Sequence, residues 1–162
     1  MKTKSREDYK YILKEDFHCE MDLSNLFTGT DITEFKSKWG KITPKGITIY
    51  AEYAWDGCSG NVWQGETIVP EPWMPVVYDN GERYTDTLAA SLVHDYFYQF
   101  LFDIRRDSGY SLWKIRKVAD QAFYHILIRA NFKCSRLYYI GVRLLGPITY
   151  VRRCISAVKR KI

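Results

Sequence analysis

The stretch LAASLVHDYFYQFLF at residues 88–102 decides the fold, because it predicts an apolar helix. Apolar residues recur along it at helical spacing, and Thr85 or Asp86 is placed to cap its N-terminus. The run Asp-Ser-Gly at 107–109 breaks the helical pattern. We therefore expect a first helix that runs to about Phe102.

Two further helical patterns follow this one. Ser111 is placed to cap a helix that reaches about Asn131, and a third helical stretch begins near Ser135. The dipeptide at 146–147, Gly-Pro, is expected to interrupt or end the third stretch. Beyond it, residues 148–161 have the pattern of a basic amphipathic helix.

The chain upstream of these helices has the composition of β-strands. Residues 47–53 are rich in β-branched and aromatic side chains, and the Pro-Lys-Gly sequence at 44–46 supplies a turn before them. Weaker strand patterns cover 18–23 and 38–42, and the Gly and Pro residues within 56–83 are typical of a long ordered loop. Strands followed by helices predict an α+β fold, with N-terminal antiparallel strands and a three-helix C-terminal half.

Length and composition fit one domain with a packed core. The chain has 162 residues, of which 46% are hydrophobic and 16% aromatic, and this excludes an intrinsically disordered protein. We expect an N-terminal arm or short helix at 1–16, a single α+β domain at 17–146 and a basic amphipathic helix at 147–162. The four cysteines form no Cys-x-x-Cys pair, which argues against a zinc knuckle and against a disulfide framework.

The distribution of charge suggests an anionic partner. The net charge is +5, and nine of the 24 Lys and Arg residues lie after Gln121, where the sequence holds no Asp or Glu. Phospholipid head groups, nucleic acid and an acidic protein surface all suit such a basic C-terminal region. No nucleic-acid-binding module accompanies the charge, so nucleic acid is not favoured. No apolar run reaches the ~20 residues of a membrane-spanning helix, and the charged N-terminus lacks the apolar stretch of a secretory signal.

The first of three candidate motifs is WDGCSG at residues 55–60. Asp56 is followed by Gly57 and Gly60, and such small residues let backbone carbonyls turn toward a hard cation beside the carboxylate. The alternative is a turn in which the Asp56 side chain hydrogen-bonds its own backbone.

The second motif is VHDYFY at residues 93–98, inside the apolar helix. His94 and Asp95 point about 100° apart around a helix, so they serve neighbouring directions rather than pairing with each other. Tyr98 follows one turn later and is placed to hydrogen-bond an inward carboxylate. A lone histidine is usually a satisfied core residue, but burying a histidine beside an acid favours a functional role.

The third motif is KVADQAFY at residues 117–124, on the second helix. Asp120 lies beside the apolar face and is placed to orient His94 through one ring nitrogen, which leaves the other nitrogen free as a base. The alternative is an ordinary aspartate on a helix surface. His18 and His125 lack metal-site spacing to His94, and we expect both to be ordinary side chains.

The motifs in this order resemble a phage-borne family of domains of unknown function. Its pattern runs Asp-Gly-Ala-Ser, a Pro/Trp-rich loop, Ala-Ala-x-x-His-Asp-Tyr-Leu-Tyr, Ala-Asp-x-x-Phe and Tyr-x-x-Val-Arg-x-x-Gly. The chain shows DGCS at 56–59, AASLVHDYFY at 89–98, ADQAF at 119–123 and YIGVRLLG at 139–146. The resemblance covers roughly residues 45–146. It implies a phage protein of the host cytoplasm or the virion, with other phage proteins as partners, and it brings no settled activity.

The His-Asp-x-x-Tyr helix and the Gly-rich loop also resemble phospholipases A2. That resemblance implies calcium held by Asp56, Asp95 and the Gly57 carbonyl, with His94 drawing a proton from water and Asp120 fixing its tautomer. Calcium would polarise a lipid ester carbonyl and stabilise the oxyanion. The basic C-terminal region, with exposed Trp or Tyr residues, would dock the enzyme on an anionic lipid surface.

The chain departs from the phospholipases in two places. Val93 stands where many of these lipases have a cysteine, and Gly60 and Asn61 stand where the phage family usually has Ile-Pro, so the loop is abbreviated. Two other interpretations therefore stay open. One is a non-catalytic virion, tail or host-interaction protein with a structural His/Asp network. The other is a metal-dependent hydrolase of amides or phosphates.

Overall fold

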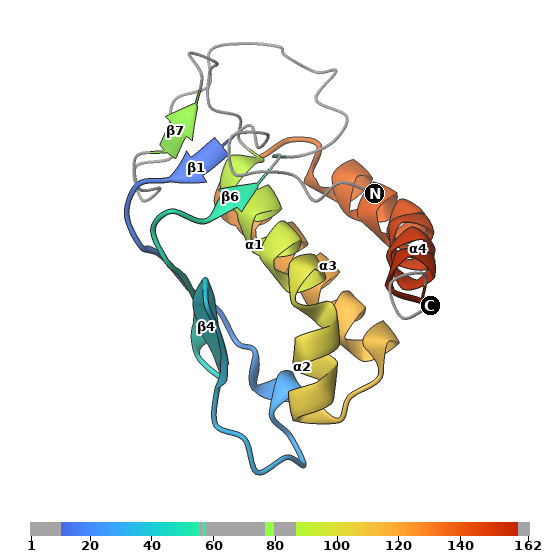
Figure 1. The fold of residues 1–162 in the computed structure, drawn as a ribbon. Helices are drawn as coiled ribbons and strands as arrows, with labels where there is room; N and C mark the ends of the chain where they lie inside the picture. Colours follow the sequence, from blue (N-terminus) through green and yellow to red (C-terminus); the bar gives the residue numbers. More distant parts are fainter. Residues whose placement is uncertain (1–10, 56, 58–76, 80–86, 159–162) are drawn as a thin grey trace.

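The chain folds as an α+β protein, as its sequence predicts (Figure 1). The computed structural model describes residues 11–55, 57, 77–79 and 87–158. The strands described are β1 (Tyr11–Leu13), β2 (Phe17–Glu20), β3 (Phe35–Ser37), β4 (Gly40–Thr43), β5 (Gly46–Ile49), β6 (Ala54–Trp55) and β7 (Val77–Asp79). The helices described are α1 (Leu88–Gln99), α2 (Leu101–Ser108), α3 (Leu112–Arg129) and α4 (Ser135–Val158).

The described strands form two antiparallel sheets. One has the order β6-β1-β7 and the other the order β2-β5-β4-β3. In β2, Phe17 and Cys19 are buried while His18 and Glu20 are exposed, which is the alternation expected of a strand with one face on the core.

Strand β1 shows that residues 11–13, within the loose arm or short helix expected at 1–16, form a strand. Tyr11 and Leu13 are buried, and Ile12 pairs with Ala54 on one side and Tyr78 on the other. Three residues are too few to show a strand period, so the pairing with distant segments decides the conformation. The pattern at 47–53 also divides, because β5 ends at Ile49 and the chain turns before β6.

The helix boundaries match the sequence signals where a cap sets them. The Ser111 side chain accepts a hydrogen bond from the Lys114 backbone N–H and starts α3, as predicted. Gly109, with φ of 70°, ends α2 in the left-handed conformation that favours glycine. The expected first helix is two helices, since α1 ends before Phe100 and α2 continues to Ser108. The predicted caps Thr85 and Asp86 lie outside the described residues.

Helix α4 runs through Gly146 and Pro147 without a break, so the expected interruption there is wrong. Pro147 has no N–H to give to the carbonyl of Arg143, four residues earlier in the helix. Arg116 of α3 supplies the missing donor, because its Nη2 lies 3.2 Å from the Arg143 carbonyl oxygen. A side chain from a neighbouring helix thus satisfies the acceptor that the proline leaves open.

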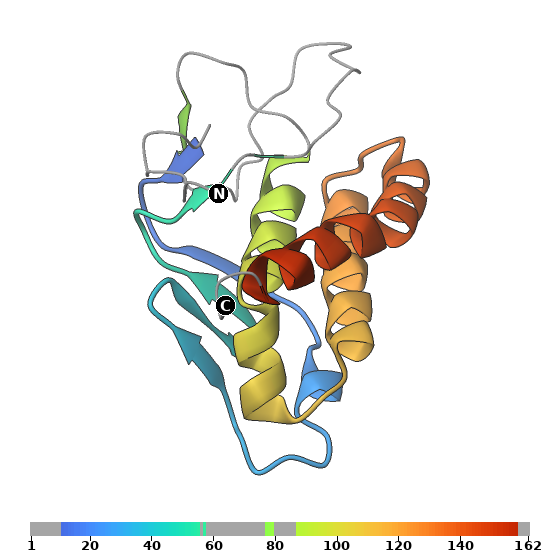
Figure 2. The same cartoon turned by 45° about the vertical axis from the view of Figure 1, so that its right-hand side comes forward.

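The helices pack as an antiparallel α1–α3 pair with α4 lying across it (Figures 1 and 2). None of the helices in the described ranges has both the length and the apolar character needed to cross a membrane. Side-chain hydrogen bonds fix α1 to the strands: Trp55 Nε1 to Ser91 Oγ (3.2 Å), Tyr53 OH to Gln99 Oε1 (2.8 Å) and Ser37 Oγ with Tyr96 OH (2.8 Å). Another side of α1 therefore faces α3, and this side carries His94 and Tyr98.

Candidate functional site

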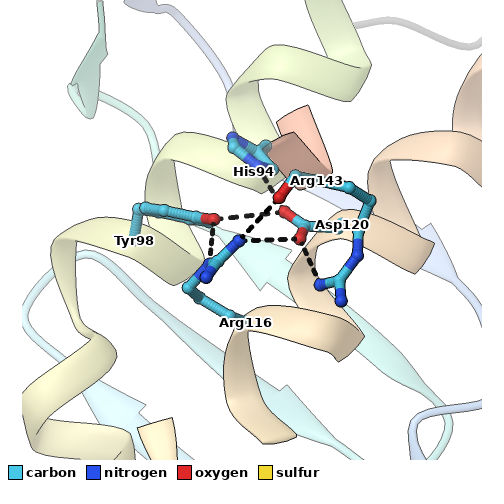
Figure 3. Close-up of polar contacts among 5 residues, drawn as sticks. All are labelled: His94, Tyr98, Arg116, Asp120 and Arg143. Atoms are coloured by element: carbon cyan, nitrogen blue, oxygen red, sulfur yellow. Dashed lines mark hydrogen bonds and ion pairs between the residues drawn. The ribbon is translucent and has the colours of Figure 1, made fainter. Parts of the chain in front are cut away.

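A polar cluster built around one aspartate joins three helices, and we call it the Asp120 network (Figure 3). Helix α1 contributes His94 and Tyr98, α3 contributes Arg116 and Asp120, and α4 contributes Arg143. The predicted partners His94 and Asp120 are 26 positions apart in the sequence, and the α1–α3 packing brings them into contact.

Asp120 is fully buried, and both of its carboxylate oxygens have partners. Oδ1 lies 3.0 Å from His94 Nε2 and accepts a hydrogen bond from the Tyr98 hydroxyl at 3.2 Å. Oδ2 accepts from Arg143 Nη1 at 2.8 Å and lies 3.8 Å from Arg116 Nη2. A buried carboxylate without such partners would be strongly destabilising, so these contacts explain how Asp120 is kept in the core.

The contact with Asp120 sets the state of the His94 ring. A carboxylate only accepts hydrogen bonds, so Nε2 carries the proton and Nδ1 of the neutral ring has a free lone pair. No described residue hydrogen-bonds Nδ1. The ring stacks on Tyr98 at 4.4 Å and meets the edge of Phe123 at 5.3 Å, while 14% of the side chain stays exposed. His94 is thus fixed in orientation and reachable from solvent.

Tyr98 acts as a link between the carboxylate and an arginine. Its hydroxyl donates to Asp120 and accepts from Arg116 Nε at 2.8 Å. Burial, together with the nearby Asp120 charge, raises the pKa of Tyr98 to about 12, although Arg116 acts in the opposite direction. The hydroxyl therefore keeps its proton at neutral pH and remains a donor to Asp120. The inward carboxylate that Tyr98 was expected to hydrogen-bond is Asp120 of α3.

The sequence predicted no role for either arginine of the network, although Arg143 is the arginine of the YIGVRLLG motif at 139–146. Arg116 is only 3% exposed, and it lies four residues before Asp120 on α3, a spacing that puts both side chains on one helix face. That spacing was a usable signal. Arg143 reaches Asp120 from α4, and no local pattern indicates a contact between residues 23 positions apart.

The expected calcium ligands are not assembled by the described residues. Asp95 is half-buried on α1 and takes no part in the described contacts of Asp120. Gly57 is buried with φ of 75°, and a Cβ there would meet the Tyr11 ring. Asp56 lies outside the described residues, and the described ranges contain no group of three His, Cys, Asp or Glu side chains that fits a metal ion. The pairing of Asp56 with Asp95 stays a prediction.

The two remaining histidines lie away from the Asp120 network. His18 is exposed on β2, where its Nδ1 lies 3.0 Å from Thr48 Oγ1. His125 is exposed on α3, next to the ring of Tyr124. Neither has a described contact with His94 or Asp120, and the expectation that both are ordinary side chains stays a prediction.

Comparison with known proteins identifies no family for this chain. No protein-family model, no curated protein and no solved structure matches the chain. The resemblances to the phage-borne family and to phospholipases A2 therefore stay hypotheses that rest on the quoted motifs.

Proposed function

We propose that the chain is a phage-encoded, calcium-assisted hydrolase of lipid esters in which His94 is the general base. One observation carries the proposal. A fully buried carboxylate holds His94 through Nε2, while Nδ1 has no partner among the described residues and the side chain is partly exposed. A histidine held at one nitrogen and open at the other is the arrangement that base catalysis uses.

The reaction follows from the state of the ring. Nδ1 of His94 takes a proton from water as the water oxygen bonds to the ester carbonyl carbon. Asp120 stabilises the resulting imidazolium through the Nε2 hydrogen bond. The tetrahedral intermediate then expels the alcohol, which receives the proton from Nδ1, so that a fatty acid and a lysolipid leave. Asp120 acts through His94, and it is therefore a positioning residue in this scheme.

Tyr98, Arg116 and Arg143 support this scheme by fixing Asp120. Tyr98 holds Oδ1, the oxygen that also faces His94, while Arg143 holds Oδ2 from the other side. With both oxygens engaged, the carboxylate cannot rotate away from the imidazole without breaking a buried hydrogen bond. A base whose partner is fixed in this way keeps its orientation toward the attacking water.

Calcium enters the proposal through the phospholipase A2 resemblance. The Asp95 carboxylate and the Gly57 carbonyl are oxygen donors of the type that Ca²⁺ prefers, and Gly57 has the left-handed backbone that a tight loop needs. Calcium takes about six to eight oxygens, so Asp56 and water would complete the site. When bound, the ion would polarise the ester carbonyl and stabilise the oxyanion.

Fatty-acid release from mixed phospholipid vesicles tests the base. We expect His94→Asn to lower the rate by roughly 10² to 10⁴-fold, the usual contribution of a general base. His125→Asn is the matched control, because it changes an exposed histidine on α3 outside the Asp120 network and should retain the wild-type rate. Equal rates in His94→Asn and wild type would overturn the mechanism.

Calorimetric titration with calcium tests the ion separately. We expect wild type to bind calcium and Asp95→Asn to bind it far more weakly, with Asp103→Asn as a control on the neighbouring helix α2. Calcium binding without fatty-acid release would point to a hydrolase of another substrate. Absence of binding would remove calcium from the proposal.

The Asp120 network also favours a second candidate, a non-catalytic phage virion, tail or host-interaction protein. The observation behind it is that the carboxylate is satisfied from three helices, as in a network that specifies a fold. In that case His94→Asn lowers the melting temperature, and neither the variant nor wild type releases fatty acid.

A further inference from the structure

Helix α4 exposes a row of large apolar side chains, which we call the outer stripe: Leu137, Ile140 and Leu144. They are 64%, 46% and 68% exposed, and their spacing of three and four residues places them on one side of the helix. Leu145, beside them, is 62% exposed. A helix side that faces solvent normally carries polar residues, so a contiguous apolar row indicates a surface that binds something.

The outer stripe does not help α4 to pack on its own protein. Val142 and Tyr138 pack against the core, and Gly146 lies against Tyr98 and Arg116. Val142 and Gly146 lie about 140–180° around the helix from Leu137 and Leu144, and Tyr138 lies about 100° from Leu137. The stripe is therefore available for a partner.

Positive charge borders the outer stripe at its N-terminal end. Arg136 precedes it on α4 and is exposed, and Lys133 is exposed just before the helix begins. Residues 121–162 contain no Asp or Glu, so no acidic residue in this part of the sequence offsets that charge. An apolar row bordered by uncompensated positive charge fits a surface that is itself both apolar and anionic.

An exposed tryptophan lies beside this helix. Trp113 of α3 is 59% exposed, and the guanidinium groups of Arg116 and Arg143 lie 5.1 Å and 4.9 Å from its ring centre. Tryptophan concentrates at the boundary between lipid and water, because its ring is apolar and its N–H is polar. Its contact with Arg143 extends the amphipathic surface of α4 onto α3.

We propose that the outer stripe of α4 docks the protein on a membrane surface that contains anionic phospholipid. The leucines enter the acyl boundary while Arg136 and Lys133 meet the head groups. Nucleic acid would engage the basic residues but give the leucines no apolar partner, and a second copy would bring like charges together. This docking surface deepens the proposed lipid hydrolysis, on which it rests, by stating how the protein meets its substrate.

The test is co-sedimentation of the full chain with vesicles of ether-linked phosphatidylcholine, alone or mixed in about equal parts with ether-linked phosphatidylglycerol, in the presence of EDTA. Ether lipids have no ester to cleave, so binding is measured apart from hydrolysis. We expect binding to the mixed vesicles, weakened by salt, and little binding to phosphatidylcholine alone.

Matched variants locate the surface. The double substitution Leu137→Gln with Leu144→Gln should weaken vesicle binding at least about tenfold, and Arg136→Gln about fivefold. Ile128→Gln should bind like wild type, because Ile128 is 50% exposed on α3, outside the outer stripe. His94→Asn should also bind fully, so a failed hydrolysis and a failed docking surface give different results.

Three outcomes would overturn the docking proposal. One is absence of binding to the anionic vesicles, and another is unchanged binding by the double leucine variant. The third is a dimer or a complex with duplex DNA that the double variant abolishes while wild type ignores vesicles. Vesicle binding that the double variant loses, with no fatty-acid release from ester lipids, would support docking and count against the hydrolase alone.

Discussion

The two sides of α4 depart from the arrangement usual for a helix on a protein surface, although Val142 and Tyr138 of its inner side pack against the core. Its inner side brings a charged residue, Arg143, to a fully buried carboxylate and a glycine, Gly146, to a tyrosine hydroxyl. Its outer side exposes Leu137 and Leu144 to solvent. The difference teaches that the position of α4 depends strongly on polar contacts and close approach at the Asp120 network, whereas its apolar row contributes little to the fold.

The largest test of this comparison is removal of the carboxylate. We expect Asp120→Ala to lower the free energy of unfolding by about 3–5 kcal/mol, because it leaves the buried Arg116 and the partly buried Arg143 without their counter-charge. Urea denaturation measures the change. Gln121→Ala, at the exposed neighbouring position, should lie within about 0.5 kcal/mol of wild type. A small loss in Asp120→Ala would mean that the network does not hold α4.

This network also shows how far the sequence could predict the site. The pairing of His94 with Asp120 could be predicted, because each lies on a strongly helical segment and helical segments close in the sequence tend to pack together, as α1 and α3 do with α2 between them. The Arg143 contact could not, because it depends on the crossing of α4, and the Gly-Pro sequence at 146–147 suggested that this helix ends. The helix survives because Arg116 replaces the missing N–H, which is a tertiary contact that no local rule contains.

The elements of the fold differ in the same way: some depend on local sequence and others on contacts between distant segments. Helix α3 was predictable from its Ser111 cap and its apolar period, and both act within a few residues. Strand β1 was not, because its three residues become a strand by pairing with Trp55 on one side and Asp79 on the other.

Raising the pH tests the inner side of α4 by removing the proton from Tyr98, whose hydroxyl lies against Gly146. Below pH 10 this hydroxyl is protonated in the folded and the unfolded chain, so its contribution to stability is fully present and does not change with pH. Between pH 10 and about 12 the unfolded chain loses the proton while the folded chain, whose Tyr98 pKa is raised to about 12, keeps it. Stability should fall over that window by roughly 2 kcal/mol.

Thermal melting from pH 8 to 12 measures the effect, and Tyr98→Phe supplies the comparison. The variant should be less stable at neutral pH, because Arg116 Nε loses its acceptor, and its stability should fall less steeply with pH. Part of the loss of stability at alkaline pH should remain in this variant, since burial also raises the pKa of Tyr96. Tyr124→Phe should keep the wild-type slope. If stability falls with pH equally steeply in Tyr98→Phe and in wild type, the pH dependence does not come from Tyr98.

Two glycines of α4 test close approach on the inner side. A Cβ at Gly146 would lie 2.5 Å from the Tyr98 hydroxyl and 3.0 Å from Arg116 Nη2, so Gly146→Ala should cost about 1–3 kcal/mol by pushing α4 off the network. A Cβ at Gly141 would meet nothing within 4 Å. Gly141→Ala should therefore stabilise the helix by about 0.5–1 kcal/mol. The two substitutions lie less than two turns apart on one helix. If Gly146→Ala lowers the free energy of unfolding and Gly141→Ala raises it, the difference between the two sites is confirmed. If both change it in the same direction, the difference is contradicted.

The smallest expected effect concerns the outer side. Leu137→Gln and Leu144→Gln should each change the free energy of unfolding by less than about 0.5 kcal/mol, because both leucines are already exposed and glutamine has a similar helix propensity. Leu127→Ala, at a fully buried position of α3, should cost about 2–5 kcal/mol in the same denaturation experiment. If the outer substitutions cost as much as Leu127→Ala, the leucines must be buried in the folded protein in solution. The two sides of α4 would then both serve the fold, and the outer stripe would lose its claim to be a surface kept for a partner.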